Sequence, residues 1–316
     1  MGPLLHRATR HHHAALPPAW RDLLLGADLT ARVTSGCAID TMLEVLDACD
    51  ALQVCVTLLK GISVSEQFYP AEHLRPMSDI DVLIPANAYS DVEAALLDRG
   101  YVKLADWNLP GHQHGAPLRH VRRRTIVELH TRLFREDSPL RTDGAFGESN
   151  VAAQSMRSRY HARPVKRLTP EMQLAYIASS WFNDLTLSKF HPSFIASLFD
   201  AVYLLKASGR TLDWRGLLGW LDNDLAAASL YALLTYLPRF GVEPVPSPVL
   251  KQLASGQRMV GPIQLRLIHK ALDRHLVGAR PWALAVPPPV PGRYNPLHQF
   301  EKRVLSRLRR ATPQKA

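Results

Sequence analysis

The sequence SDIDVLI at residues 78–84 decides the fold class, because it places two carboxylates on an otherwise apolar β-strand. Side chains alternate along a strand, so Asp79 and Asp81 point to one face and their apolar neighbours to the other. Two bare carboxylates about 4 Å apart repel by roughly 4 kcal/mol at an effective dielectric constant near 20. A divalent cation removes this cost, and hard oxygen ligands favour Mg²⁺ or Ca²⁺. The strand therefore predicts metal-dependent phosphate chemistry, with an exposed edge strand carrying solvated acids as the alternative.

Two cationic side chains stand where they could meet a phosphate. The apolar run at 53–59 predicts a buried strand, and Lys60 ends it beside a turn at Gly61. Backbone amides in such a turn can approach phosphate oxygens. Arg75 lies just ahead of the two acids, and a guanidinium can bind phosphate in a bidentate manner. We expect phosphate contacts here, with a surface charge or a salt bridge to the acids as the alternative for each cation.

A third acid, Glu128, lies in the apolar run at 125–133, which predicts another strand. If the two strands are neighbours, the three carboxylates converge on one surface, where two metal ions could bridge a triphosphate. Positioning and charge neutralisation dominate phosphoryl and nucleotidyl transfer, so little covalent work is left for the protein. His130 follows on the same face. It could ligate metal or act as a base, but a hydrogen bond that supports the acids is the favoured role.

The remaining pattern predicts a mixed α/β sheet with flanking helices, followed by an all-helical region. Residues 1–16 are expected to be a loose lead-in. Thr169 and Pro170 provide a helix cap and a first turn, and apolar residues at helical spacing recur from there to residue 277. Earlier helices are expected at 17–52, 63–69 and 89–99, and strands at 53–59, 79–84, 101–105, 118–123 and 125–133.

The formal net charge of +10 over 316 residues is the unusual bulk property. It could reflect an anionic partner such as nucleotide, RNA, DNA or acidic lipid, but an arginine-rich bulk composition is the favoured interpretation. Much of the excess lies at 119–124 and 302–315, where no aromatic residues alternate with the charges to stack on bases. The basic stretch 295–310 has helical apolar spacing. We expect it to dock on the helical region, with attachment to a membrane surface as the alternative.

Other titratable residues are weaker candidates. The histidines at 11–13 are expected in a polar arm, and those at 112, 114 and 120 in a loop and a strand rather than in a metal site. Three cysteines without Cys-x-x-Cys spacing indicate reduced thiols and argue against zinc. Asp200 could reach the cleft, but a helix cap or a structural salt bridge is favoured. No apolar run of about eighteen residues and no hydrophobic signal segment is present, which favours the cytoplasm.

The motifs LLKG at 58–61, RPMSDIDVLI at 75–84 and VELH at 127–130 together resemble the uncharacterised nucleotidyltransferase family of the DNA polymerase β superfamily. Members typically read hydrophobic-Lys-Gly, Arg-Pro-Met-x-Asp-Ile-Asp-Leu-Leu-Val, and Asp-or-Glu-Leu-His. The resemblance implies a minimal nucleotidyltransferase sheet in which metal ions are bound by three acids. It also implies two Mg²⁺ ions as cofactor, with Mn²⁺ as a possible replacement. The implied ligands are Asp79, Asp81 and Glu128.

Two departures from this pattern concern the phosphates and the acceptor. The superfamily's general signature has a second Gly or a Ser directly after the first Gly, whereas Gly61 is followed by Ile62 and then by Ser63. Ser63 is therefore a phosphate-binding candidate that stands one place late. The expected helix at 175–183 carries Trp181 where histidines are expected in this family.

The resemblance predicts a metal-dependent transferase that moves a nucleoside monophosphate from a nucleoside triphosphate, such as ATP, to a hydroxyl-type acceptor. Small molecules, peptides and protein side chains all stay open as acceptors. The alternatives are kinase-like phosphoryl transfer, a catalytically inactive nucleotide-binding regulatory module, and an RNA-directed transferase. The chain is divided into an N-terminal arm and helix at 1–39, a nucleotidyltransferase core at 40–165, and a helical domain with a basic tail at 166–316.

Overall fold

A seven-stranded mixed sheet forms the centre of the computed structural model, which describes residues 2–104, 111–187 and 193–277. The strand order is β3-β4-β5-β2-β1-β7-β6; β2 pairs with β5 and β1 with β7 in parallel, and the other pairs are antiparallel. The expected mixed sheet is thereby confirmed. The strands are β1 (Thr57–Leu58), β2 (Asp79–Leu83), β3 (Tyr101–Lys103), β4 (Leu118–His120), β5 (Ile126–His130), β6 (Ser155–Tyr160) and β7 (Arg163–Leu168).

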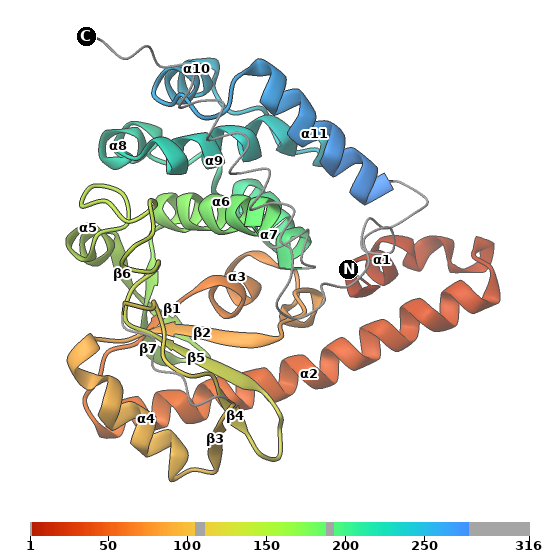
Figure 1. The fold of residues 1–316 in the computed structure, drawn as a ribbon. Coiled ribbons are helices and arrows are strands. Elements are labelled where there is room, and N and C mark those ends of the chain that lie inside the picture. The colour runs from red at the N-terminus through yellow and green to blue at the C-terminus, as the bar shows by residue number, and fades with distance from the viewer. Residues whose placement is uncertain (1, 105–110, 188–192, 278–316) are drawn as a thin grey trace, which may run out of the picture.

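One face of the sheet is covered by α2 (Pro18–Ala51), a helix of 34 residues that runs beneath the strands in Figure 1, and by α4 (Tyr89–Leu97). The helix places Met42, Val45 and Leu46 against Ile80 and Val82 of β2, and all five are essentially inaccessible to solvent. Burial of each such side chain contributes about 1.5–3 kcal/mol. This packing fixes the apolar face of β2, and therefore turns its two acids to the opposite face.

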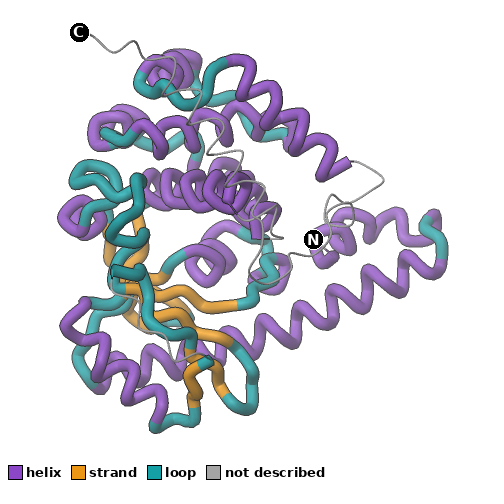
Figure 2. The backbone as a smooth tube through the Cα atoms, viewed as in Figure 1, coloured by secondary structure: helices purple, strands orange, loops and turns teal. Residues whose placement is uncertain are grey.

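The acidic face looks toward α3 (Lys60–Phe68) and the helices that follow the sheet in the chain (Figure 2). Their shared core contains Trp181, Phe194 and Leu233. The expected helical region is confirmed. Its members are α6 (Pro170–Leu187), α7 (Ser193–Ser208), α8 (Trp214–Trp220), α9 (Asp224–Tyr236), α10 (Ser247–Ser255) and α11 (Pro262–Val277); shorter elements are α5 (Glu148–Ala153), η2 (Glu72–Leu74), η3 (Ala86–Ala88) and η4 (Leu237–Phe240).

The N-terminal residues differ from the expected loose lead-in, because they form α1 (Gly2–Thr9) and η1 (Arg10–Ala15). Helix α1 folds back on α2 so closely that a Cβ at Gly2 would lie 2.4 Å from the Cβ of Ala27. Leu4 reaches the core of the later helices and lines the cavity described below. The contacts that order this segment come from residues distant in sequence, so local polarity was a poor guide.

A β-hairpin, β6–β7, was absent from the expected elements. Its turn residues His161 and Ala162 have φ of 42° and 68°, the pattern of a type I′ turn, which asparagine and glycine usually fill. Neither residue is a turn signal, and the strands are rich in arginine rather than in β-branched residues. The division into three regions stays a proposal, and its boundary after residue 165 falls inside β7, which pairs with β1.

Replacing Ala162 with glycine should stabilise the protein. A non-glycine residue with φ of 68° is held in the left-handed region at a cost of roughly 1–2 kcal/mol, which glycine avoids. Part of that gain is offset by the greater freedom of glycine in the unfolded chain. We expect a rise of about 0.5–1 kcal/mol in the free energy of unfolding, measured by urea denaturation. A decrease would show that the turn conformation is not strained.

Two expectations about the tail, a linker at 285–291 and a docked basic helix at 295–310, lie outside the described residues. Within the described part of the chain, no helix combines the length and the apolar character required to cross a membrane.

Candidate active site

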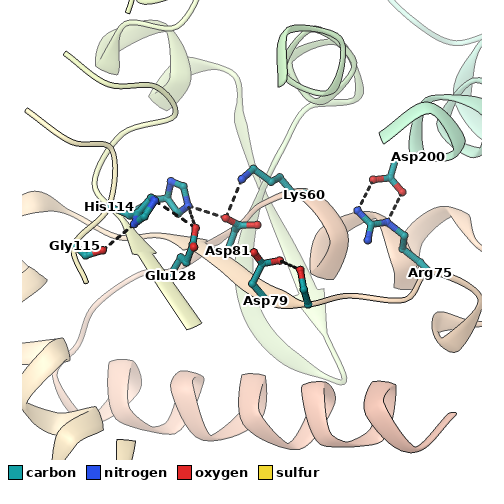
Figure 3. Close-up of polar contacts among 10 residues, drawn as sticks. Lys60, Arg75, Asp79, Asp81, His114, Gly115, Glu128 and Asp200 are labelled. Atoms are coloured by element: carbon teal, nitrogen blue, oxygen red, sulfur yellow. Dashed lines mark hydrogen bonds and ion pairs between the residues drawn. The ribbon is translucent and has the colours of Figure 1, made fainter. Parts of the chain in front are cut away.

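The acids on β2 and β5 lie side by side, because the two strands are parallel neighbours. Asp81 is paired directly with Glu128 in the register, and Leu83 is paired with His130. Paired residues of neighbouring strands share a face, so the alternation along β2 also puts Asp79 on this face. The condition that the two strands be neighbours is met, and Figure 3 shows the three carboxylates gathered above the sheet.

His130 contacts both Asp81 and Glu128. Its Nε2 donates a hydrogen bond of 2.7 Å to Oδ1 of Asp81 and lies 3.6 Å from Oε2 of Glu128. Asp81, Glu128 and His130 each offer one side-chain oxygen or nitrogen, and these three atoms all lie within 4.8 Å of one another. This spacing could hold a metal ion. The hydrogen-bonded role favoured for His130 agrees with this contact. Asp79 stands outside the tight group, and its Oδ1 accepts a 3.1 Å hydrogen bond from the hydroxyl of Ser78.

Lys60 supplies a positive charge to the same cluster. Its Nζ lies 3.0 Å from Oδ1 of Asp81. The turn expected after the strand is instead the start of α3: Lys60 is the first helical residue, with φ of 42°, and Gly61 lies inside the first turn. Gly61 is required by close packing, since a Cβ there would lie 2.9 Å from Cγ of Met77. The strand-to-helix junction therefore points the ammonium at the acids.

The electrostatics differ sharply between the two acids of β2. Burial, together with the charges of Asp81 and Glu128, raises the pKa of Asp79 to about 6, against the opposing effect of Lys60. Burial also opposes ionisation of Asp81, but Lys60 and His130 outweigh it and hold the pKa of Asp81 well below its usual range. Burial lowers the pKa of His130, yet its hydrogen bonds to the acids raise it overall. Asp79 is thus the carboxylate whose charge lacks compensation.

Arg75 is engaged in an ion pair with the helical region. Its Nε and Nη2 donate to the two oxygens of Asp200 on α7 at 2.8 and 2.9 Å, and the hydroxyl of Tyr69 donates to Asp200 at 2.7 Å. Both ionic side chains are largely buried. Asp200 therefore has the structural salt bridge that was favoured for it. Arg75 still lines the cavity, but its fork is turned to a carboxylate rather than toward the acids of the sheet (Figure 3).

Ser63 does not lie where a phosphate contact requires it. Its side chain is fully buried in the first half of α3. The hydroxyl donates to Gln173 at 3.4 Å and accepts from Gln67 at 3.3 Å. Ser63 is also absent from the described residues that line the cavity. The burial of Ser63 in α3 argues against a phosphate contact, and its phosphate-binding role stays a prediction.

A cavity of about 700 Å³ opens in front of the acids and extends to α6 and α7. Lys60, Asp79 and Asp81 lie at its sheet side. The opposite wall carries Tyr176. Burial raises the pKa of Tyr176 to about 12, although the nearby positive charge of Lys60 acts to lower it. Further polar lining comes from Ser180, Asn183 and Asp184 on α6 and from Ser197 on α7.

His114 was expected to be an ordinary loop residue, but it lies beside the acids. The backbone around it forms a bridge with His130, and its Nε2 is 3.5 Å from Oε2 of Glu128. Its Nδ1 contacts the carbonyl oxygen of Gly115 at 2.8 Å. No local pattern could have indicated this contact, because it depends on the loop folding against β5. His120 instead lies 3.8 Å from Glu44 on α2, away from the acids.

The donor set fits a hard divalent cation. Carboxylate oxygens dominate the cluster, and Asp81 and Glu128 are directly opposed across the strands. The contacts of Lys60 and His130 both use Oδ1 of Asp81, so the second oxygen of this carboxylate is the one available to a cation. Asp79, whose pKa is raised by burial and by the neighbouring acids, borders the same cavity.

The family model described as "Uncharacterised nucleotidyltransferase" matches residues 1–241. The chain belongs to this family. The match agrees with the motifs that carry Lys60, the two acids of β2 and Glu128. No curated protein matches the chain.

Three solved structures show a limited similarity to the chain. The solution structure of the antibiotic-resistance factor ANT(2'')-Ia is 13% identical, with a TM-score of 0.40, over 64% of this chain and 97% of that chain. Its crystal structure with adenylyl-2''-tobramycin is 13% identical, with a TM-score of 0.35, over 55% and 99%. An antigenic nucleotidyltransferase-like protein from Paracoccidioides brasiliensis is 16% identical, with a TM-score of 0.39, over 68% and 92%.

Proposed function

We propose that this nucleotidyltransferase moves a nucleoside monophosphate from a nucleoside triphosphate to a hydroxyl group of an acceptor bound in the same cavity. The observation that carries the proposal is the pairing of Asp81 with Glu128 across parallel strands, with Asp79 on the same face, at the edge of a large cavity. Three carboxylates in so small a volume are costly without cations. Family membership supports the same class of chemistry.

Divalent metal, with Mg²⁺ as the natural ion and Mn²⁺ as a substitute, would be held by Asp79, Asp81 and Glu128. When bound, it would neutralise triphosphate charge and activate the attacking oxygen. His130 keeps the Asp81 carboxylate in one orientation through its 2.7 Å hydrogen bond. His114 stands in the corresponding place beside Glu128. Both histidines therefore position acids rather than contact the phosphates.

Among the phosphate-binding candidates, Lys60 has the strongest support. Its ammonium faces the cavity beside Asp81, and Gly61 next to it lets the chain pack closely against Met77. Arg75 has weaker support, because Asp200 already accepts from two of its nitrogens. The acceptor would lie toward α6 and α7, where the polar lining of the cavity continues beyond the acids.

The test follows the leaving group. Each of the four nucleoside triphosphates is incubated with Mg²⁺, the protein and pooled acceptors: polyols and amino sugars, peptides, and whole proteins. We expect release of pyrophosphate and a nucleoside monophosphate adduct on the acceptor, because nucleotidyl transfer breaks the bond between the α- and β-phosphates. The Asp81→Asn variant, prepared in parallel, controls for contaminating activities.

A different leaving group would contradict the proposal. Release of a nucleoside diphosphate that depends on Asp81 would identify phosphoryl transfer by the same acids. Tight binding of a nucleotide without turnover on any acceptor pool would favour a regulatory module. The two outcomes differ in whether any product accumulates, so a single labelled experiment separates them.

A further inference from the structure

Lys60 spans the boundary between the acidic cluster and the cavity. Its Nζ lies 3.0 Å from Oδ1 of Asp81, whose side chain is only 5% exposed, whereas the Lys60 side chain is 36% exposed. Both residues line the cavity. One partner of this ion pair is thus enclosed by the protein, while the other can be reached by a ligand. Such an asymmetric pair lets the cation change partners without moving the carboxylate.

The backbone at Lys60 is anchored, so only its side chain is free to move. Helix α3 begins at this residue, and φ of 42° places it in a region that non-glycine residues seldom adopt. Strained backbone of this kind persists only where the surroundings enforce it, and it clusters at functional sites. Gly61 is packed against Met77 and Arg75. The flexible four-carbon stem of lysine is therefore the moving part.

We propose that Lys60 is a resident counter-cation of the acidic cluster, which exchanges from Asp81 to phosphate oxygens when a nucleoside triphosphate brings a divalent cation. The inference rests on the proposed function and adds a mode of regulation to it. Without nucleotide, the ammonium compensates the charge of Asp81 in the place where a cation would act. With nucleotide, the triphosphate supplies anionic oxygens that receive the ammonium as the cation takes over the carboxylates.

The exchange predicts that Lys60 has opposite effects on the affinity for a free divalent cation and on the affinity for a cation–nucleotide complex. A free divalent cation must displace Lys60 from Asp81, with no new anion to receive the ammonium. The ion pair therefore weakens binding of the free cation. A cation–nucleotide complex carries its own phosphate oxygens, so the displaced ammonium gains charge-assisted hydrogen bonds. Lys60 should thus oppose the first event and favour the second.

The experiment measures Mn²⁺ binding by electron paramagnetic resonance, in which the signal of unbound Mn²⁺ decreases as the ion binds. The titration is done with and without a non-hydrolysable nucleoside triphosphate analogue. In Lys60→Met, we expect free Mn²⁺ to bind about tenfold or more tightly than in the wild type, because a positive charge about 4 Å away is removed. The same variant should bind the Mn²⁺–nucleotide complex about tenfold more weakly. Lys60→Arg retains the charge and should bind free Mn²⁺ as the wild type does.

Lys103 offers a matched control. Its Nζ forms a 2.9 Å ion pair with Glu93, and its side chain is 38% exposed, but it is not among the described residues that line the cavity. Lys103→Met should leave both Mn²⁺ affinities unchanged. Circular dichroism checks the fold of every variant, and Lys60→Gln takes the place of Lys60→Met if the latter unfolds.

Two results would overturn the exchange: Lys60→Met binding free Mn²⁺ no more tightly than the wild type, or binding the Mn²⁺–nucleotide complex just as well. Failure of the proposed function gives a distinguishable result, because it is read from the leaving group and the acceptor adduct in the transfer assay, whereas the exchange is read from the two Mn²⁺ affinities. Opposite changes in the two affinities would support the exchange, since loss of a merely structural lysine would weaken both.

Discussion

Asp81→Asn should abolish nucleotidyl transfer and destabilise the protein, whereas Asp79→Asn should abolish transfer and leave the metal-free protein as stable or more stable. For each variant we expect a loss of more than about 100-fold in turnover. Replacing a residue that only hydrogen-bonds to a metal ligand already costs about 10–100-fold in metal affinity or activity, and these variants replace the proposed ligands themselves. The two effects on stability differ in sign because the negative charge of Asp81 is balanced by Lys60 and His130, whereas that of Asp79 is not. Asp81 accepts hydrogen bonds from Lys60 and His130, both of which lose an ionised partner when it is replaced.

Asp79 has the opposite balance. Its pKa is raised to about 6 by burial and by the neighbouring acids, so its ionisation opposes folding above that pH. Asparagine has nearly the same shape and no charge. At pH 7.5 without divalent ions, we expect the free energy of unfolding of Asp79→Asn to rise on the order of 1 kcal/mol, or about 1–2 °C in Tm.

Thermal unfolding and pyrophosphate release, measured on the same preparations, test this pair of variants. Mg²⁺ with nucleotide should raise the Tm of the wild type and of neither variant, since binding only to the native state stabilises it. Wild-type turnover in both variants would exclude Asp79 and Asp81 as metal ligands. A fall in Tm for Asp79→Asn equal to that of Asp81→Asn would show that both acids serve the fold.

The central strands of the fold were predictable from the sequence because their signals are local. Asp79 and Asp81 alternate with Ile80 and Val82, and this period of two is a property of the strand alone. The 34 residues of α2 likewise follow their helical periodicity closely. The pairing of Asp81 with Glu128 was expected only on the condition that the strands are neighbours, and the structure supplies that condition.

What escaped prediction depends on contacts between distant segments. His114 meets Glu128 because its loop folds back on β5, and nothing near His114 in the sequence records that path. Ser63 was considered for phosphate by its distance along the chain, but the early start of α3 rotates it into the core. The β6–β7 hairpin has a turn at His161 and Ala162 that lacks the usual residues. In each case tertiary packing overrode the local signal.

The buried ion pair between Arg75 and Asp200 carries the largest expected effect on stability. It links the segment before β2 to α7, and the exposed fractions of its side chains are 13% and 2%. Asp200→Asn would leave the guanidinium buried without a counter-charge, and the hydroxyl of Tyr69 would lose its ionised acceptor. We expect a loss of about 3–5 kcal/mol in the free energy of unfolding, measured by urea denaturation, because breaking one side of a buried pair strands the other charge.

A double variant, Arg75→Met with Asp200→Leu, distinguishes this penalty from the value of the contact itself. Removing both charges should recover most of the loss, since an apolar pair no longer carries a desolvated ion. Arg163 is the exposed control: it contacts Asp47 and Asp50 at 2.6 Å each, distances shorter than those of the buried pair, yet Arg163→Met should change stability far less. Equal losses for Asp200→Asn and Arg163→Met would mean that ion-pair distance, and not burial, governs these contacts. A double variant as unstable as Asp200→Asn would show instead that the pair is net stabilising, so that the segment before β2 is held to α7 by the charges themselves.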